Sequence, residues 1–283
     1  MSEQGKVYID NADVFSTYGA MLADGCYQSI LAWPAAKTPE MNDWAEYDGV
    51  EIDFATYHLN TRTVTLVFWF DGEGDPDAFI TLLETDAAHT FKFGTLGDRT
   101  WDLRFVGVTA QAQADYLLKL TFTFSDDTPT VSGTPSATMT YYESGYTLNC
   151  VNGSTTYSND LADFDCRTLY GTDLFTHKGD IKQNVLYQSK YEDGAAYAEN
   201  SGQSRKKTTD GTIRLLLRST SISALLNNYY ALLKACYQTR TIDHEGKRYS
   251  AVYKSQSVTK YIAPDWLEFA VTFTLTGEVT DIE

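Results

Sequence analysis

Residues 63–70 alternate between apolar and polar side chains, a period of two that is typical of a β-strand with one buried face. The apolar face consists of Val64, Leu66, Phe68 and Phe70. After an acidic, glycine-rich turn, Asp75 stands before Pro76, the pattern of a helix N-cap with proline in the first turn. We therefore predict a strand and then a short helix that ends near Ala88. The inward face of this helix consists of Phe79, Leu82 and Leu83.

A hairpin and a further strand complete this unit. Residues 90–93 and 100–108 have strand-like composition on either side of "GTLGDR", whose two glycines indicate a turn. Residues 117–125 alternate again, which predicts another half-buried strand. Its apolar residues are Leu118, Leu120, Phe122 and Phe124. The predicted order is strand, helix, hairpin, strand.

The same order begins again at Thr212. The positions 149 residues after Val64, Leu66 and Phe68 are Ile213, Leu215 and Leu217. A longer stripe with helical spacing follows, at Ile222, Leu225, Leu226, Tyr229, Leu233 and Cys236. The turn "DHEGK" predicts a second hairpin, in which Tyr249 takes the place of Trp101. The last strand repeats at the same offset of 149, with Leu267, Phe269, Val271 and Phe273.

Four elements in one order at a nearly constant offset indicate an internal duplication. We expect an α+β protein, mainly β, with two similar antiparallel β-sandwich or barrel domains and one flanking helix in each. The predicted domains are residues 1–130 and 139–283, and residues 125–138, "SDDTPTVSGTPSAT", have the composition of a linker or exposed loop. Residues 16–22 and 168–175 are a further candidate pair of counterparts.

Composition agrees with two ordered domains, since the 283 residues include 43% hydrophobic residues and only 6 prolines. The formal charge is −16. Residues 1–141 carry 7 basic and 21 acidic side chains, and residues 142–283 carry 15 and 17. Such a surface repels phosphates, so tight nucleic-acid binding is not expected. The negative charge either keeps the protein soluble or lines a channel wall past which DNA slides without binding.

Nothing in the sequence predicts secretion or a membrane span: Met1 is followed by the polar run "SEQGK", and no window approaches 18 continuous apolar residues. Four cysteines without CxxC spacing are expected to be reduced, and we interpret each as a small buried hydrophobic residue. They are Cys26, Cys150, Cys166 and Cys236.

Residues 71–77, "DGEGDPD", place the carboxylates of Asp71, Glu73 and Asp75 at alternate positions, as at the start of a calcium-binding loop. An EF-hand needs glycine at its sixth position and glutamate at its twelfth, where this chain has Pro76 and Leu82. Calcium at this loop stays an open alternative.

The four histidines lie far apart and outside any zinc-binding pattern; they are His58, His89, His177 and His244. We interpret His244 as a hairpin-turn residue and the others as ordinary surface or core-edge residues. No nucleophile elbow or phosphate-binding loop occurs. A hidden pair of glycosidase carboxylates cannot be recognised from spacing, but no catalytic, cofactor-binding or metal-binding residues are predicted, and we expect no enzyme activity.

Residues 201–211, "SGQSRKKTTDG", form the one dense basic run, with Arg205, Lys206 and Lys207. We interpret this run as a solvated loop. The alternative is a contact with the acidic first half of a neighbouring subunit, because complementary patches orient an assembly.

The opening "VYIDNADVFSTYGAML" resembles the start of phage distal tail (Dit-like) proteins, in which a short strand with an Asn/Asp turn precedes a Tyr-Gly step. The matching residues are Tyr8, Ile9, Asp10, Asn11 and Ala12, then Tyr18 and Gly19. Residues 57–70, "YHLNTRTVTLVFWF", also resemble the core of that family. The resemblance covers about the first 125 residues, and the second half is more similar to the first half than to the family's usual carboxy-terminal domain.

The resemblance implies tail-tube-like domains, each with two packed sheets and a flanking helix, in a ring around the DNA channel at the tail tip. Two copies in one chain are similar to the hub proteins of T4-type baseplates, whose trimers present pseudo-sixfold symmetry to a hexameric tube. The implied partners are further copies of the chain, as a trimer or a hexamer, together with tail tube and baseplate hub proteins. DNA passes through without specific binding, and no membrane is involved.

The expected function is therefore a non-catalytic structural protein of a phage or prophage tail tip or baseplate, located in the virion after synthesis in the bacterial cytoplasm. Two arguments that do not use the resemblance agree with this function. Closure of a ring gives free strand edges a pairing partner, and a channel wall that faces DNA should carry negative charge. The alternative is a tandem β-sandwich module that binds a carbohydrate or receptor, which exposed aromatic residues at one concave site would favour.

Overall fold

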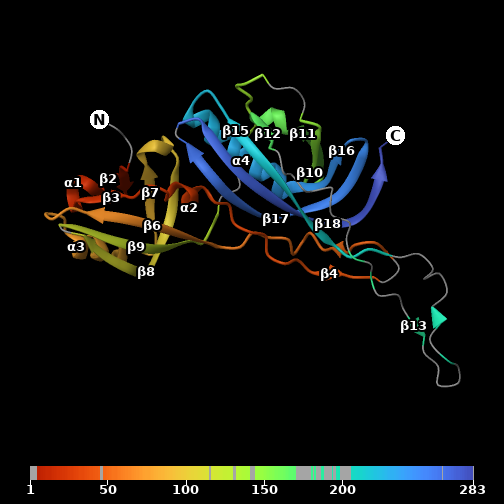
Figure 1. Ribbon diagram of the computed structural model, residues 1–283, viewed down its shortest axis with the longest axis horizontal. Helices are drawn as coiled ribbons and strands as arrows, with labels where there is room; N and C mark the ends of the chain where they lie inside the picture. The colour runs from red at the N-terminus through yellow and green to blue at the C-terminus, as the bar shows by residue number, and fades with distance from the viewer. Residues whose placement is uncertain are drawn as a thin grey trace.

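The computed structural model describes residues 5–44, 47–114, 116–129, 132–140, 144–169, 205–262 and 264–282, together with 180, 182, 186–187, 193 and 196–197. Two seven-stranded sheets lie next to each other along the long axis of the molecule (Figure 1). The pairings in both sheets are antiparallel and helices are few, so the fold is α+β and mainly β, as predicted.

The first sheet has the strand order β2-β1-β7-β8-β9-β6-β3. Its strands are β1 Val7–Ile9, β2 Ala12–Asp13, β3 Ala20–Leu22, β6 Arg62–Phe70, β7 His89–Phe93, β8 Thr100–Ala114 and β9 Leu117–Asp126. The helices of this half are α1 Val14–Tyr18, α2 Tyr27–Leu31, α3 Pro76–Thr85 and the 3-10 turn η1 Gly94–Leu96. The connection from β3 to β6 contains a small ladder of β4 Met41–Asn42 with β5 Glu51–Ile52.

The second sheet has the order β11-β10-β16-β17-β18-β15-β12. Its strands are β10 Tyr146–Asn152, β11 Thr155–Asp160, β12 Cys166–Thr168, β15 Thr209–Arg218, β16 Thr239–His244, β17 Lys247–Ile262 and β18 Trp266–Asp281. Its helices are α4 Ile222–Gln238 and the 3-10 turn η2 Leu161–Phe164. The connection from β12 to β15 contains β13 Leu186–Tyr187 paired with β14 Ala196–Tyr197.

The two sheets share one topology. Replacing β1, β2 and β3 by β10, β11 and β12, β6 by β15, and β7, β8 and β9 by β16, β17 and β18 converts the first strand order into the second. The helix α3 follows β6, and α4 follows the equivalent strand β15. A two-stranded ladder precedes each of these strands, β4 with β5 in the first half and β13 with β14 in the second. The predicted order of strand, helix, hairpin and strand is present in both halves.

The positions of β-bulges support the equivalence of the two sheets. The β8–β9 ladder has a bulge directly after Phe105, and the β17–β18 ladder has one directly after Tyr253. Phe105 lies opposite Phe124, and Tyr253 lies opposite Phe273, so the predicted offset of 149 is consistent with the register of the last strand.

The offset of 149 predicted for the first strand is wrong by two residues. Val64 lies opposite Phe124, but Gly211 and not Ile213 lies opposite Phe273. The counterparts of Leu66, Phe68 and Phe70 are therefore Ile213, Leu215 and Leu217. A slip of two residues leaves every side chain on its face, so an alternating pattern cannot reveal it.

The proposed match of residues 16–22 with 168–175 is also wrong. In each half a single helical turn ends in a left-handed residue before the edge strand: Gly19 with φ 67° and Asp165 with φ 57°. Aspartate tolerates this conformation, so no Tyr-Gly pair is needed. The counterpart of 16–22 is residues 162–168, whereas most of 168–175 lies outside the described residues.

Both flanking helices start where the sequence predicts. The carboxylate of Asp75 and the hydroxyl of Ser221 each accept a backbone N–H three residues later, at 2.9 and 3.2 Å. The helix α3 ends at Thr85, earlier than predicted, and Leu82 is only half-buried. Its buried residues are Phe79 and Leu83. The longer α4 is buried on most of its surface because it lies between its own sheet and the first half of the chain.

A continuous apolar core joins the two sheets. Tyr229 of α4 donates a hydrogen bond to the carbonyl of Leu31 (2.6 Å), and the indole N–H of Trp101 donates to the hydroxyl of Tyr230 (3.1 Å). The domain bounds 1–130 and 139–283 remain a prediction. Part of the first half nevertheless lies on the second sheet.

Candidate assembly surfaces

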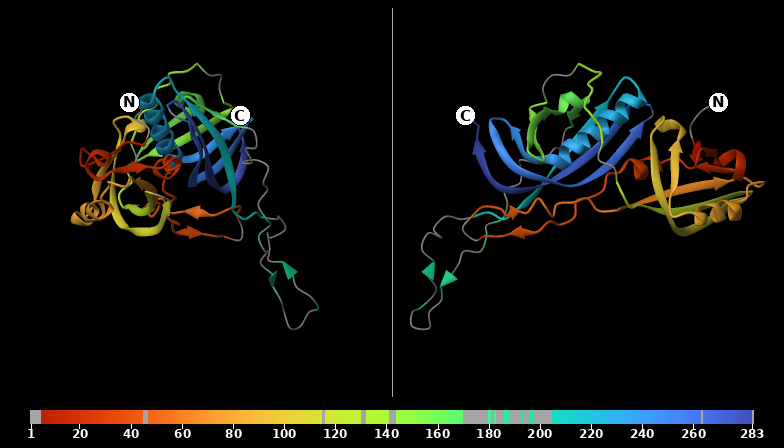
Figure 2. Two further views of the ribbon diagram at one scale, coloured as in Figure 1. Left: turned by 60° about the vertical axis from the view of Figure 1, so that its left-hand side comes forward. Right: turned by 180° about the vertical axis from the view of Figure 1, so that it is seen from behind.

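Residues 32–61, here called the strap hairpin, leave the first sheet and extend along the second (orange in Figure 1; Figure 2, right). Two backbone hydrogen bonds close its base: the N–H of Lys37 donates to His58 (2.7 Å), and the N–H of Asn60 donates to Ala35 (2.9 Å). The ladder of β4 with β5 lies near its tip.

The strap hairpin and the preceding α2 cover a free edge of β17. This strand pairs with β16 up to Ser250 and from there on with β18 alone. Lys254 is the extra residue of the bulge, and its carbonyl accepts the N–H of Ala36 (2.8 Å). Further contacts along this edge join the Tyr57 hydroxyl to the Tyr253 carbonyl (2.5 Å), the Trp33 N–H to the Gln256 side chain (2.7 Å) and the Gln28 side chain to the Thr259 carbonyl (3.1 Å).

Tyr57 anchors the strap hairpin. Its side chain is 4% exposed and stacks on Tyr237 of α4, with 5.1 Å between ring centroids. Burial raises the pKa of Tyr57, which keeps the phenol neutral and able to donate. Next to it, the guanidinium of Arg240 lies 3.9 Å from the ring centre of Phe54.

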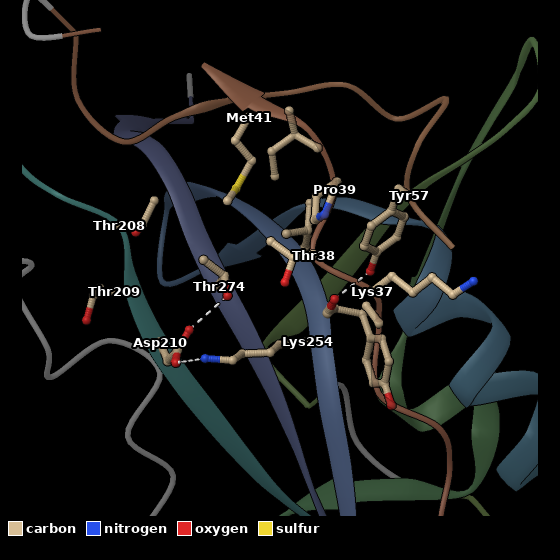
Figure 3. A pocket seen from close by; sticks show the side chains of 14 residues that line it. Lys37, Thr38, Pro39, Met41, Tyr57, Thr208, Thr209, Asp210, Lys254 and Thr274 are labelled. Carbon is tan, nitrogen blue, oxygen red and sulfur yellow. Dashed lines mark hydrogen bonds and ion pairs between the residues drawn. The ribbon is translucent and has the colours of Figure 1, made fainter. Parts of the chain in front are cut away.

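A cavity of about 370 Å³ lies between the strap hairpin and strands β15, β17 and β18 (Figure 3). Asp210 forms an ion pair with Lys254 and accepts the hydroxyl of Thr274 at 2.8 Å. Much of the remaining lining is apolar, including Met41 and Ile52. Among the described lining residues Asp210 is the one carboxylate, so this cavity lacks the acid pair that glycoside hydrolysis needs. We interpret this cavity as a gap in the packing between the strap hairpin and the second sheet.

Arg62 stands where the strap hairpin re-enters the first sheet. Its Nε lies 2.8 Å from Asp126, and the two side chains are 9% and 11% exposed. Its Nη1 donates to the carbonyls of Ile30 (2.8 Å) and Ala32. This arginine, part of the family resemblance, therefore joins both ends of the strap hairpin to β9.

The basic run lies against the tip of the strap hairpin. The backbone N–H of Lys206 donates to Asp48 (2.6 Å), and the Lys206 carbonyl accepts the N–H of Gly49 (2.8 Å). Lys182 forms an ion pair with Asp43 at 2.5 Å. Within one chain, the backbone of Lys206 therefore contacts the acidic first half at Asp48 and Gly49. Residues 201–204 lie outside the described residues.

The acidic loop 71–77 has a structural role. Asp71 accepts the N–H of Glu73 (3.2 Å), and the Asp75 N–H donates to the Tyr18 carbonyl (3.0 Å). The loop packs so closely on the Tyr-Gly step that a Cβ on Gly19 would lie 2.7 Å from the Cα of Gly74. Among the described residues, no three His, Cys, Asp or Glu side chains gather as metal ligands.

The histidines occupy unrelated places. His89 is buried, with Nδ1 2.6 Å from the carboxylate of Asp10 in the left-handed β1–β2 turn. Burial opposes ionisation of Asp10, but hydrogen bonds from His89 and Thr90 outweigh it and lower the pKa of this carboxyl. His244 ends β16, and its Nδ1 donates to the Gly145 carbonyl (2.7 Å). His58 is exposed on the strap hairpin, and His177 lies outside the described residues.

All four cysteines are free and buried, as predicted. Burial raises the pKa of each thiol, which makes a reactive thiolate unfavourable.

A second strand edge, in the first sheet, has no such cover among the residues that the structure describes. The strand β8 pairs with β7 up to Leu103 and with β9 alone from Arg104 to Ala114. Val106, the extra residue of the bulge, is 56% exposed, and Val108 is 40% exposed. These two valines and the adjoining backbone, here called the β8 edge, are the surface that corresponds to the covered edge of β17.

No protein-family model and no curated protein matches the chain. Among solved structures, the chain is similar to Dit (gp 19.1) of phage SPP1, which is described as a paradigm of the hub adsorption apparatus in phages that infect Gram-positive bacteria. The alignment covers 95% of this chain and 98% of that protein, at 14% identity and a TM-score of 0.34. Among the described residues, no helix is long and apolar enough to cross a membrane.

Proposed function

We propose that this chain is a non-catalytic structural protein of a phage or prophage tail tip or baseplate, which assembles into a ring and connects the tail tube to the hub. The observation that carries the proposal is the repeated seven-strand topology, which gives one chain two equivalent units for a ring. The residues that resemble distal tail proteins add support. Asp10 and Asn11 form the β1–β2 turn, both with positive φ, and Gly19 ends α1.

In this proposal the ring is a trimer with pseudo-sixfold symmetry or a hexamer, and DNA passes through its channel. The surplus of acidic side chains in residues 1–141 fits a channel wall that does not trap a passing polyanion. The protein would be made in the bacterial cytoplasm and reside in the virion.

Immunoelectron microscopy tests this role. Gold-labelled antibodies against the chain should mark the head-distal tail end of particles released by the producing strain. Antibody preadsorbed with the purified protein is the control. Particles whose tails stay unlabelled while the same antibody detects the free protein would contradict the proposal.

A carbohydrate- or receptor-binding module is the second candidate. Trp44 and Tyr47, 53% and 69% exposed, flank a hollow of about 420 Å³ near the tip of the strap hairpin. The acidic groups beside them are already engaged, since Glu51 accepts the Trp44 indole (3.3 Å) and Asp48 accepts the Lys206 N–H. Glycan-array binding that Trp44→Ala removes would favour this candidate.

A further inference from the structure

A small cavity of about 190 Å³ lies where the first sheet, the strap hairpin and α4 meet. The strap hairpin contributes Trp33, the turn directly before β8 contributes Arg99, and α4 contributes Tyr230. Both other side chains contact the Tyr230 ring: the Trp33 ring lies 5.7 Å from it, between centroids, and the guanidinium carbon of Arg99 lies 3.3 Å from its centre. Three elements that are far apart in the sequence therefore line one cavity.

Two of these side chains carry buried hydrogen-bond donors that have no acceptor in the part of the chain that the structure describes. They are the indole Nε1 of Trp33, a residue that is 5% exposed, and the guanidinium Nε of Arg99. Both groups can only donate, and a buried donor without an acceptor destabilises the folded chain. The hydroxyl of Tyr230 is a third donor, because it accepts the Trp101 indole at 3.1 Å and keeps its own proton for another partner.

The carboxylates that line this cavity already have donors. Asp126 accepts the Nε of Arg62 at 2.8 Å, and Asp102, which is exposed, accepts the hydroxyl of Thr90 at 2.6 Å. The charge of Arg62 is therefore neutralised by Asp126, whereas Arg99 has no ion pair among the described residues. The cavity thus combines one unpaired positive charge with donors that lack an acceptor.

We propose that this cavity binds a small oxyanion of the phosphate class, which accepts hydrogen bonds from Trp33, Arg99 and Tyr230. An oxyanion has several oxygens for donors from different directions, and a guanidinium forms strong, charge-assisted hydrogen bonds with it. Water in the cavity satisfies the donors but does not neutralise the charge of Arg99. The bound anion joins the strap hairpin and α4 to the first sheet. The inference goes beyond the proposed function and does not depend on it.

The indole N–H signals in ¹H–¹⁵N NMR spectra of the full chain test this site directly. Titration with inorganic phosphate, at an ionic strength held constant with sodium chloride, should shift the Trp33 signal until the site is saturated. The signal of Trp69, on β6 and outside the cavity, should stay in place. The variants Trp33→Phe and Trp69→Phe assign the two signals. A Trp33 signal that moves no more than that of Trp69 would show that the cavity holds water alone, and would overturn the proposal.

A charge-removing variant gives an independent measurement. Arg99→Gln should weaken phosphate binding by about tenfold or more in isothermal titration calorimetry, because it removes the charge-assisted hydrogen bonds. Phosphate should also raise the Tm of the wild-type protein more than that of Arg99→Gln, since a ligand that binds only the folded chain stabilises it.

Arg104→Gln is the matched control. Arg104 lies on β8 of the same sheet, is exposed, and pairs with Asp127 at 2.6 Å outside the cavity, so this variant should bind phosphate as the wild type does. Circular dichroism checks that both variants are folded, and if Arg99→Gln does not fold, the NMR titration of the wild type decides. Binding that is unchanged in Arg99→Gln, or equally weakened in Arg104→Gln, would refute the site.

Discussion

Asp165 is a buried carboxylate that holds three separate segments together. Its side chain accepts hydrogen bonds from the backbone and hydroxyl of Thr138, the N–H of Met139, the hydroxyl of Ser219 and the amide of Asn228, at 2.6 to 2.9 Å. Burial opposes ionisation, yet these donors outweigh it and lower the pKa of Asp165. The residue thus fixes the segment between the two sheets onto α4 and β12.

Replacing Asp165 should therefore be costly. Asp165→Ala leaves buried donors unpaired and should lower the free energy of unfolding by about 3 kcal/mol or more at neutral pH, measured by urea denaturation. Because the folded pKa lies below the ordinary 3.8, the stability from this carboxylate is present above that value and lost as pH falls through the folded pKa. The stability gap between wild type and Asp165→Asn should narrow only below about pH 4. A gap that stays constant into stronger acid would contradict this account.

At the scale of elements, the α1 turn and the acidic loop depend on two glycines that meet back to back. Gly19→Ala adds a Cβ in left-handed backbone and against Gly74, so we expect a loss of about 3 kcal/mol. Gly25→Ala is the matched control, since Gly25 also has positive φ (88°) but no atom near a new Cβ. It should cost about 1 kcal/mol. Equal losses in thermal denaturation would show that the close approach contributes nothing.

The strap hairpin should depend on the ring of Tyr57 more than on its hydroxyl. Tyr57→Phe removes one hydrogen bond and should cost about 1 kcal/mol, whereas Tyr57→Ala also empties the stack on Tyr237 and should cost about 3 to 4 kcal/mol. Limited proteolysis measures the consequence directly, because release of the strap hairpin frees the hydrogen-bonded backbone at the exposed Lys37 for cleavage by trypsin. Faster cleavage in Tyr57→Phe than in Tyr57→Ala would contradict the ranking.

The amphipathic elements were predictable from sequence because their signals are local. Strands β6, β9 and β18 alternate with a period of two, Asp75 stands at the start of α3, and the helical stripe of α4 begins at Ile222. The two-residue slip of β15 was invisible to that period. The strap hairpin could not be found, because Ala36 and Tyr57 bond to β17, about 200 residues later in the chain. The β8 edge left only a weak signal, two valines flanking Gly107 in a strand that continues beyond its hairpin partner.

At the scale of the whole molecule, the two units are repeated but not independent. Tyr230 of α4 lies at their junction, with the Arg99 guanidinium 3.3 Å from its ring centre and the rings of Trp33 and Tyr230 5.7 Å apart. The strap hairpin adds the contacts to β17. If one unit unfolded while the other stayed folded, this shared core would be exposed to water. A state with only one sheet folded is therefore unfavourable.

We therefore expect one cooperative unfolding transition. Labelling all five tryptophans with 5-fluorotryptophan leaves the junction in place, and the ¹⁹F signals of Trp69 in the first sheet and Trp266 in the second should change at the same urea concentration. Tyr230→Ala in the labelled protein weakens the junction and should separate the two midpoints, whereas Tyr249→Ala, in the β16–β17 hairpin, should leave them coincident. Distinct midpoints in the labelled wild-type protein would show that each unit folds by itself, and the strap hairpin would then be an accessory contact rather than part of one folding unit.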